Sequence, residues 1–406
     1  MSTVPETAPL SRAEWEQALR QDAQALPTQT PGWLEAICAQ GEWVEAGRRY
    51  RWDDGTRIVL PLVRRTGPPE AGLSQPGPTE PGPTEPGPPE PGQHGLGEGA
   101  FRRTGFEQAE SGRTGTGRTA RAQSAFDQSA FDQSAFDQST FGQAAFGQTD
   151  FASWPAEWGV GGPLCPDGPP TPAQTAAVLA DLARLPGGVR LRVGPLTARP
   201  WAAAVPSRSP CTPRTTHVVD LTGPDGSWRQ RLQPAARRSM RKAARSGLDV
   251  TRGRTRGDLE VFYALYQESM ERWAAQSGEP TDRVRHRIES RDPLHRLVTV
   301  AERLGEACSV WTAWYRGEPA ASVILLRQGP QQKYWRGAMS RPLAAPTRAN
   351  HLLHELALQE AADAGCTHYH MGDSHPGGVA RFKESLGARP HPTPAYVLPS
   401  AGGAVR

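Results

Sequence analysis

The sequence predicts a mixed α/β fold made of two lobes, with a long insert in the first lobe that has no regular fold. Three observations support this. The C-terminal half carries apolar patterns in the order strand, strand, strand, helix, strand, helix, strand. Helix-start signals and short strand patterns lie on both sides of a stretch of repeats. The repeats have a period of five residues, which fits neither helix nor strand. We therefore expect a first lobe at 1–65 plus 153–215, an insert at 66–152 and a second lobe at 216–400.

Composition narrows the class of protein. The chain has 406 residues, enough for two domains, but only 37% of them are hydrophobic. A net charge of +4 does not by itself indicate nucleic acid, and no DNA partner is expected. No apolar run approaches the roughly 20 residues that span a bilayer, and no signal-peptide pattern is present, so we expect a cytoplasmic protein. The cysteines lack zinc-site spacing, so no metal site is expected.

The first lobe is expected to begin with two capped helices and a hairpin. A capping box at Ser11–Glu14 starts a helix to about Leu26. Thr30 and Pro31 start a second helix, which ends near Gly41. The remaining elements are a hairpin with its turn at Asp54–Gly55, a helix from Thr171–Pro172 to about Leu185, and a strand at Val189–Val193. A strand at His217–Leu221 follows, after the end of this lobe. Between these parts, Pro-Gly repeats and Phe-containing repeats cannot build a core, so the insert is expected to be disordered.

The second lobe is expected to hold a three-stranded meander followed by alternating helices and strands. A basic helix from Trp228 to about Ser246 comes first, and Gly247 ends it. Asn350 is placed as the cap of a helix that runs to Ala364. The other elements are strands at Leu248–Arg252, Cys308–Tyr315, Ala320–Arg327, Lys333–Met339, Thr367–Met371 and Ala395–Leu398, and helices at Asp258–Ala275, Pro293–Leu304 and Gly378–Leu386.

The basic helix presents one strongly cationic face. Stepping 100° per residue brings five cations onto one side of the helix, while small and apolar residues occupy the other. No acidic residue between Arg229 and Ser246 can pair with them along the helix. The cations are Arg237, Arg238, Arg241, Lys242 and Arg245. This pattern favours a polyanionic partner, such as tRNA, a diphosphate-linked precursor or the phosphates of CoA. The alternative is a solvated face that pairs with acids elsewhere in the fold.

Several of these segments resemble the FemAB-like relatives of the GNAT acyltransferases. Arg237–Leu248 is similar to their basic segment ending in glycine and an apolar residue. Tyr369–Asp373 and Ala380–Gly387 resemble their "Y-D-hydrophobic-G" and "F-K-x-x-hydrophobic-G" ending. Thr30–Trp33 and Ile58–Leu62 resemble their N-terminal lobe. The resemblance covers about 27–65 and 153–399. It implies two GNAT-like lobes and attack by an amine on an activated carbonyl.

The resemblance also implies a site for the acyl donor. A typical GNAT binds the donor pyrophosphate on backbone N–H groups at a helix N-terminus after a glycine-rich turn. The matching segment, 341–350, has no glycine, which counts against CoA. It still offers anion-binding groups at Arg341, Thr347, Arg348 and Asn350. The alternative is an ordinary capped helix with exposed arginines.

The expected catalytic groups are Asp373 and Lys383. Asp373 could accept a proton or orient the amine, and Lys383 could stabilise an oxyanion or contact substrate; a structural ion pair is the alternative for Lys383. The leading hypothesis is transfer of an acyl group from acyl-CoA, such as acetyl-CoA, to an amine without a covalent enzyme intermediate. No bound cofactor is expected. A second hypothesis is a FemAB-type enzyme that uses aminoacyl-tRNA and a peptidoglycan precursor. A third is a non-catalytic polyanion-binding adaptor.

Overall fold

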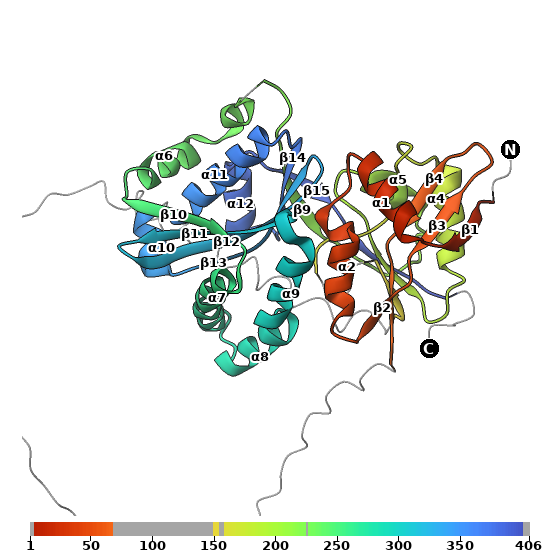
Figure 1. Ribbon diagram of the computed structural model, residues 1–406, viewed down its shortest axis with the longest axis horizontal. Helices are drawn as coiled ribbons and strands as arrows, with labels where there is room; N and C mark the ends of the chain where they lie inside the picture. The colour runs from red at the N-terminus through yellow and green to blue at the C-terminus, as the bar shows by residue number, and fades with distance from the viewer. Residues whose placement is uncertain (1–3, 68–148, 154–157, 225, 401–406) are drawn as a thin grey trace, which may run out of the picture.

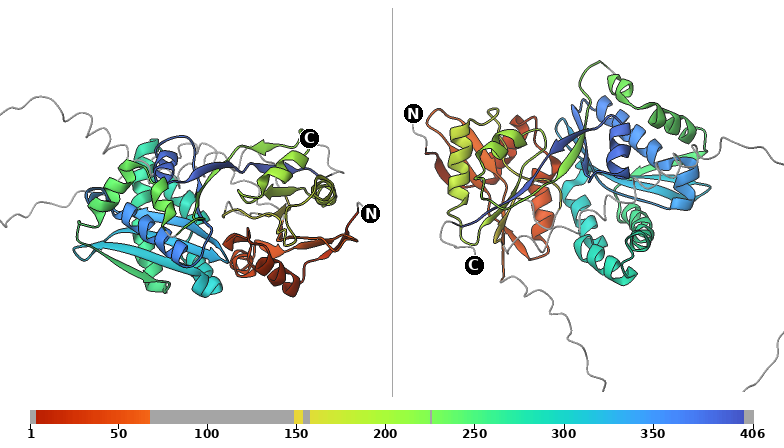
Figure 2. Two further views of the ribbon diagram at one scale, coloured as in Figure 1. Left: turned by 90° about the horizontal axis from the view of Figure 1, so that it is seen from above. Right: turned by 180° about the vertical axis from the view of Figure 1, so that it is seen from behind.

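The computed structural model describes residues 4–67, 149–153, 158–224 and 226–400 and shows two lobes side by side (Figures 1 and 2). Each lobe is built around its own mixed sheet with helices packed on it, so the predicted two-lobed α/β class is confirmed. Most of the expected insert, 68–148, lies outside the described residues. Among the described residues, no helix combines the length and apolar character that a membrane span needs.

The C-terminal lobe contains a seven-stranded sheet in the order β10-β11-β12-β13-β14-β9-β15. All neighbouring strands are antiparallel except β13 and β14. The strands are β9 (Thr215–Asp220), β10 (Leu248–Gly253), β11 (Cys308–Tyr315), β12 (Glu318–Gln328), β13 (Gln331–Met339), β14 (His368–Asp373) and β15 (Arg389–Pro392). The predicted meander and the strand after it are therefore present.

Helices cover both faces of this sheet, as Figure 1 shows. One face carries α6 (Pro234–Ala243), α10 (Arg341–Thr347), α11 (Ala349–Asp363) and α12 (Gly378–Ser385). The other face carries α7 (Arg256–Ser277), α8 (Thr281–Arg291) and α9 (Leu294–Leu304). The 3-10 turns η3 (Ser227–Arg231) and η4 (Gly305–Ala307) precede α6 and β11. The sequence did not predict α8, because Val284 and Ile288 are its only buried residues and it shows little apolar periodicity.

The N-terminal lobe contains a six-stranded sheet in the order β2-β5-β6-β7-β16-β8 and a three-stranded sheet in the order β1-β3-β4. The strands are β1 (Glu6–Pro9), β2 (Trp43–Glu45), β3 (Arg48–Arg51), β4 (Arg57–Leu60), β5 (Val63–Arg65), β6 (Phe151–Ala152), β7 (Val189–Arg192), β8 (Cys211–Thr212) and β16 (Ala395–Leu398). The helices are α1 (Arg12–Gln21), η1 (Pro27–Gln29), α2 (Pro31–Cys38), α4 (Pro172–Leu182) and α5 (Ala198–Ala204).

Local sequence signals place the starts of α1, α2 and α4 correctly, whereas α5 was not predicted. The Ser11 hydroxyl accepts a hydrogen bond from the Glu14 backbone N–H at 3.3 Å, and the Glu14 carboxylate accepts one from the Ser11 backbone N–H, as the capping box predicts. Helix α1 nevertheless ends at Gln21, five residues before the expected end. Asp22 follows in an extended conformation, and its carboxylate accepts the backbone N–H of Cys165 at 2.7 Å. A tertiary contact therefore ends this helix.

Two expected boundaries are wrong. The insert was expected to end at residue 152, yet Phe151–Ala152 is β6, paired with both β5 and β7. The second lobe was expected to run to residue 400, yet Ala395–Leu398 is β16, paired with β7 and β8 of the other lobe. An apolar strand pattern does not specify which sheet the strand joins. Strand β15 was not predicted because it contains two prolines, which an edge strand tolerates.

The chain crosses between the lobes twice, at neighbouring places. It leaves the N-terminal lobe between β8 and β9 and returns between β15 and β16. The two crossings are joined by a hydrogen bond from the Thr393 N–H to the Arg214 carbonyl at 2.8 Å. The C-terminal lobe is thus inserted into the N-terminal one.

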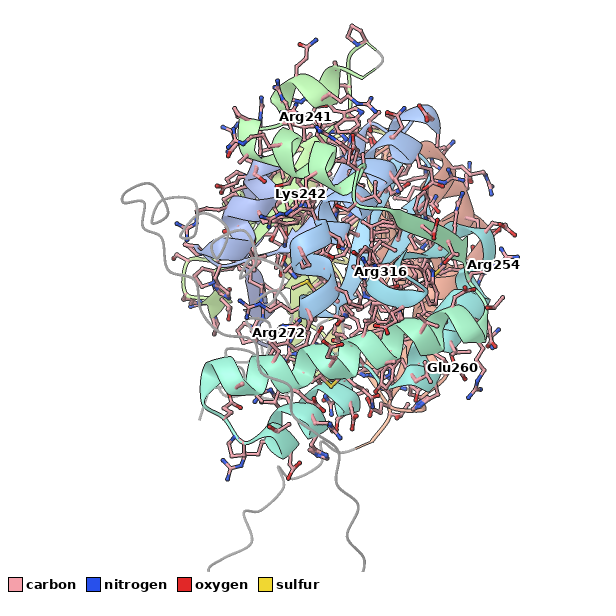
Figure 3. All side chains as sticks on the ribbon, turned by 90° about the vertical axis from the view of Figure 1, so that its left-hand side faces the viewer. Arg241, Lys242, Arg254, Glu260, Arg272 and Arg316 are labelled. Atoms are coloured by element: carbon pink, nitrogen blue, oxygen red, sulfur yellow. The ribbon has the colours of Figure 1, made fainter. Side chains whose placement is uncertain are left out.

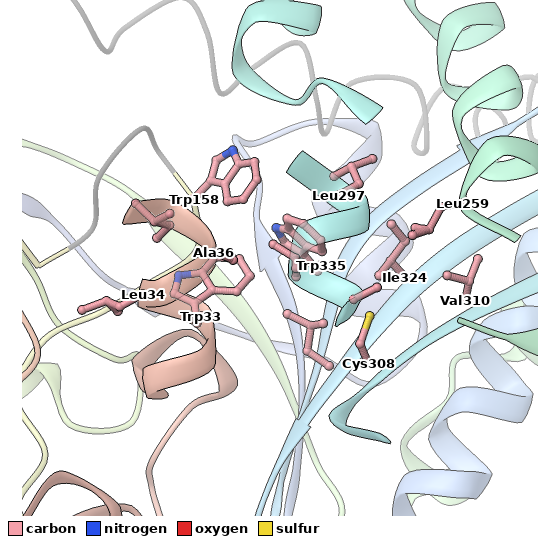
Figure 4. Close-up of a cluster of buried hydrophobic side chains, with 14 of the residues drawn as sticks. Trp33, Leu34, Ala36, Trp158, Leu259, Leu297, Cys308, Val310, Ile324 and Trp335 are labelled. Carbon is pink, nitrogen blue, oxygen red and sulfur yellow. The ribbon is translucent and has the colours of Figure 1, made fainter. Parts of the chain in front are cut away.

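A shared aromatic core holds the lobes together (Figure 4). The rings of Trp33, Trp158 and Trp335 pack against one another with centroids 5.2–5.7 Å apart. Trp33 and Trp158 belong to the N-terminal lobe and Trp335 lies on β13. Next to them α2 approaches α9 so closely that a Cβ on Gly32 would stand 2.7 Å from the Arg303 carbonyl oxygen. The lobes therefore pack as one continuous hydrophobic core.

Candidate functional site

The parallel strands β13 and β14 pair over only a short distance. Their register joins Gln331–Lys333 to His368–His370 and no further. Beyond that point β14 continues against β9, while β13 continues against β12. The later parts of β13 and β14 therefore do not hydrogen-bond to each other in the described structure. At the end of β14 the carbonyl oxygens of Gly372 and Asp373 instead accept hydrogen bonds from Lys383.

Lys383 lies at the carboxyl end of β14. Helix α12 carries it, and its Nζ donates hydrogen bonds to the carbonyl oxygens of Gly372 at 3.2 Å and Asp373 at 2.5 Å. Gly372 has φ 72°, a left-handed conformation that suits glycine. The Lys383 side chain is buried, and burial lowers its pKa to about 7, opposed by Asp373 and assisted by Lys333. A lysine with this pKa is partly neutral at neutral pH.

Asp373 forms an ion pair across the lobe boundary. Its Oδ1 accepts hydrogen bonds from Nη2 of Arg192 at 2.6 Å and from the Thr216 hydroxyl at 2.7 Å, and Arg214 lies 3.9 Å from Oδ2. Burial alone would raise the pKa of Asp373, but Arg192, Thr216 and Arg214 together hold it well below its ordinary value. A carboxylate held in this way is a poor proton acceptor. The expected role of Asp373, to accept a proton or to orient the amine, stays a prediction; in the structure its carboxylate accepts hydrogen bonds from Arg192 and Thr216.

Two residues near this site were not singled out as functional by the sequence. Arg192 was seen only as part of a strand, and nothing in its local sequence indicates a partner 181 residues away. Lys333, on β13 opposite His370, is 4% exposed, and burial lowers its pKa to about 8. A signal for Lys333 did exist. Lysine is rare in this arginine-rich chain, occurring only at Lys242, Lys333 and Lys383, so two of the three lysines lie beside the end of the β13–β14 pairing.

The segment that was expected to bind the acyl donor, residues 341–350, has a different local structure from the predicted one. Asn350 does not cap α11: the cap position is Arg348, in a left-handed conformation with φ 62°, and Asn350 is the second helical residue. The Asn350 amide donates to Sδ of Met339 at 2.9 Å, and the Thr347 hydroxyl donates to the Leu343 carbonyl at 2.6 Å. Both side chains are buried, so neither presents itself to a solvent-borne anion. The error arose because α10 directly precedes α11, which a pattern search for caps does not detect.

The arginines of this segment remain accessible. Arg341, the first residue of α10, is exposed, and Arg348 is partly buried between α10 and α11. Because Ala349 and Asn350 are buried, the first turn of α11 is largely covered by protein. Of the expected anion-binding groups, only the side chains of Arg341 and Arg348 therefore remain as candidates.

The predicted cationic face is present on the outside of the C-terminal lobe. Figure 3 shows Arg241 and Lys242 on α6, away from the sheet. The five side chains are exposed, and within the described part of the chain none of them forms an ion pair: Arg237, Arg238, Arg241, Lys242 and Arg245. Helix α6 ends at Ala243, so Arg245 lies just beyond it, and its Nε donates to the Arg241 carbonyl at 3.2 Å. Among the described residues, no three His, Cys, Asp or Glu side chains are arranged to hold a metal ion.

Comparison with known proteins shows what the chain is similar to. A family model described as an acetyltransferase (GNAT) domain matches residues 230–384. The structure of FemX is similar over 96% of both chains, with 11% identity and a TM-score of 0.56, which shows a common fold. A tandem GNAT protein from the clavulanic acid biosynthesis pathway covers 97% of both chains, with 13% identity and a TM-score of 0.43. A search of curated proteins finds no match.

These findings agree with the resemblance seen in the sequence. Residues 230–384 contain β10 to β14 and most of α12, including Asp373 and Lys383. Residues 230–384 therefore match a family model described as an acetyltransferase (GNAT) domain, and the chain as a whole shares the fold of FemX.

Proposed function

We propose that the protein transfers an acyl group from acyl-CoA to an amine by direct attack. The observation that carries this proposal is that β13 and β14 cease to pair beside the buried amine of Lys383. An extended, amide-containing arm such as that of CoA can hydrogen-bond to the open strand edges. Its reactive carbonyl would then lie near the end of β14.

Lys383 is the group best suited to accept a proton there. In its neutral form the amine has two N–H donors and one lone pair, and the carbonyls of Gly372 and Asp373 take both donors. The lone pair then remains for the attacking amine. In the proposed step the acceptor nitrogen bonds to the acyl carbon and loses a proton to Lys383. The carbon–sulfur bond breaks, and the thiolate leaves.

The donor phosphates would be bound away from the point where β13 and β14 cease to pair. Arg341 and Arg348 are the available cations next to α11, and they can pair with phosphate without a glycine-rich turn. The α6 cations form a second, larger cationic surface on the same face of the sheet. No bound cofactor is required, because acyl-CoA is consumed as a co-substrate.

Donor binding tests this proposal. Acetyl-CoA and an aminoacyl-tRNA should be titrated against wild type, Arg341→Ala, Arg348→Ala and the control Arg256→Ala, whose side chain is 71% exposed and pairs with Glu260. We expect acetyl-CoA to bind and both α10–α11 variants to weaken it. Lys383→Met should retain binding but lose transfer of labelled acetyl to a panel of primary amines. Failure of acetyl-CoA to bind wild type would refute the proposal.

A second candidate is aminoacyl transfer from tRNA to the amine of a peptidoglycan precursor. The observation that favours it is the cationic face on α6, which forms no ion pair with the residues that the structure describes, together with a donor segment that lacks glycine. The same titration separates the two, because this candidate predicts binding of aminoacyl-tRNA and no binding of acetyl-CoA. A third candidate, a polyanion-binding adaptor, predicts salt-sensitive RNA binding without transfer from either donor.

A further inference from the structure

A serine, a histidine and a glutamate form a hydrogen-bonded chain beside Lys383. The Ser374 hydroxyl lies 2.9 Å from Nδ1 of His217, and Nε2 of His217 lies 3.5 Å from Oε1 of Glu384. The residues come from the loop after β14, from β9 and from α12, so three separate elements bring them together. The Ser374 amide donates to the Thr215 carbonyl at 3.1 Å, which fixes the serine backbone.

The donor and acceptor capacity of each group determines the direction of the hydrogen bonds among Ser374, His217 and Glu384. An ionised glutamate can only accept, so Nε2 of His217 must carry the proton that is shared with Glu384. In a neutral imidazole, Nδ1 is then the acceptor and receives the hydroxyl proton of Ser374. Burial lowers the pKa of His217, and nearby Lys383 lowers it further, against the opposing effects of Glu384 and Asp373. The imidazole is therefore neutral at neutral pH and able to take a proton.

The surroundings resemble those of an activated nucleophile. Ser374 and His217 are buried, while the Glu384 side chain is 40% exposed and connects the chain to solvent. Helix α12 begins at Gly378, four residues after Ser374, and its N-cap residue, Gly377, has no side chain that could cap it. The N–H groups of its first turn are donors of the kind that stabilise an oxyanion.

We propose that Ser374, His217 and Glu384 form a second reactive site that hydrolyses activated esters or thioesters through an acyl-serine. Oγ of Ser374 attacks the acyl carbonyl, and its proton passes to Nδ1 of His217. The bond to the alcohol or thiol breaks, and the leaving group takes that proton. Water then attacks the acyl-serine, again giving a proton to His217, and the carboxylic acid leaves as Ser374 regains its proton. Glu384 orients the imidazole, and Lys383 takes no part in these steps.

Covalent labelling tests the proposal without knowledge of any natural substrate. The full-length protein is treated with a fluorophosphonate, and the labelled peptide is identified by mass spectrometry. p-Nitrophenyl acetate hydrolysis is followed in parallel. We expect an adduct on Ser374 that Ser374→Ala abolishes. His217→Gln should slow labelling by about 10²–10⁴-fold, the usual contribution of a general base. Glu384→Gln should have a smaller effect, because its contact is longer and partly exposed.

The matched control is Ser322→Ala, a fully buried serine that hydrogen-bonds Thr312 and no histidine. It should label as wild type does. Thermal melting of each variant identifies any that fail to fold. Absence of an adduct on folded wild-type protein, or an adduct that persists in Ser374→Ala, overturns the proposal. Because acetyl-CoA binding is measured separately, failure here leaves the proposed acyl transfer untouched.

Discussion

Arg192 and Asp373 lie in different lobes, 181 residues apart, and are joined by a 2.6 Å hydrogen bond between buried, oppositely charged groups. Arg192 ends β7, and Asp373 ends β14 next to the carbonyl that Lys383 contacts. The pair therefore links the sheet of one lobe to the candidate site of the other.

Breaking this pair from the arginine side should destabilise the protein strongly. Arg192→Met leaves the Asp373 carboxylate buried with fewer partners, and removing one member of such a pair costs about 3–5 kcal/mol. The control Arg49→Met removes contacts to two exposed carboxylates, those of Glu6 and Glu14, and should cost about 0–1 kcal/mol. Urea denaturation measures both. Equal losses of unfolding free energy in the two variants would show that the inter-lobe pair stabilises the protein no more than a surface pair does.

Replacing Lys333 should stabilise the protein in a pH-dependent way. Its pKa is about 8 in the folded protein and about 10.5 in the unfolded chain. Below pH 8 both states hold the proton, so the folded state bears the full cost of a buried ammonium. As pH rises from 8 to 10.5 the folded state loses the proton first, and that cost disappears. Lys333→Met should therefore be more stable than wild type at pH 7, with the gain shrinking toward pH 10.

Denaturation at pH 7 and pH 9.5 checks this expectation, with the exposed Lys242→Met as control. The control should show no pH-dependent gain. A Lys333→Met gain that grew with pH would reverse the assigned direction of the pKa shift.

Two helical glycines should respond oppositely to alanine. Gly32→Ala places a methyl group 2.7 Å from the Arg303 carbonyl oxygen, so backbone must move, and we expect a loss of about 1–3 kcal/mol. At Gly257 the nearest atom to a new Cβ is the Thr255 hydroxyl oxygen at 3.7 Å. Gly257→Ala should therefore raise stability by about 0.5–1 kcal/mol, because alanine favours the helix. Thermal melting distinguishes them, and a stabilised Gly32→Ala would contradict the close packing of α2 and α9.

The α6 face should bind polyanions in a salt-dependent way. Replacing both Arg238 and Arg241 with Gln should reduce the slope of log affinity against log salt for RNA by about 0.7 per lost phosphate contact. Arg256→Gln is the control, since its charge already pairs with Glu260. Fluorescence anisotropy with a labelled tRNA at several salt concentrations measures the slopes. An unchanged slope in the double variant would exclude this face as the contact.

The insert should be removable, provided that β6 is kept. The Arg65 N–H donates to the Asp150 carbonyl at 2.8 Å, so the two ends of the excised segment lie side by side. Joining 67 to 149 with a short flexible linker should leave cooperative melting intact. A matched deletion extending through Ser153 removes Phe151–Ala152, which pairs with both β5 and β7, and should abolish folding of the N-terminal sheet. The opposite ranking of the two deletions would disprove this topology.

Features that depend on neighbouring residues could be predicted from the sequence, whereas pairings between distant residues could not. The capping box at Ser11–Glu14, the proline at the start of α2 and the apolar patterns of β11, β12 and β13 depend on neighbouring residues and were predicted correctly. The partner of Asp373 and the sheet that β16 joins depend on contacts about 180 or more residues away, which periodicity does not encode.

The site shows the same division. Lys383 was found because it lies in a recognisable motif, and its predicted place on a short helix after β14 is correct. Asn350 was misplaced because an asparagine near a helix start resembles a cap, while α10 changes what that residue contacts. His217 and Ser374 are distant in sequence and form no motif, so their contact became evident only in the structure.

The return of the chain to its first lobe has a mechanical consequence. Residues 4 and 400 both belong to the N-terminal lobe, where Figure 2 places the two marked ends. Tension applied between them would act on β1 and β16 and so load that lobe directly. The seven-stranded sheet would experience little force until β16 had been pulled from between β7 and β8. In an optical trap the molecule should therefore rupture in a fixed order, with the C-terminal lobe yielding last.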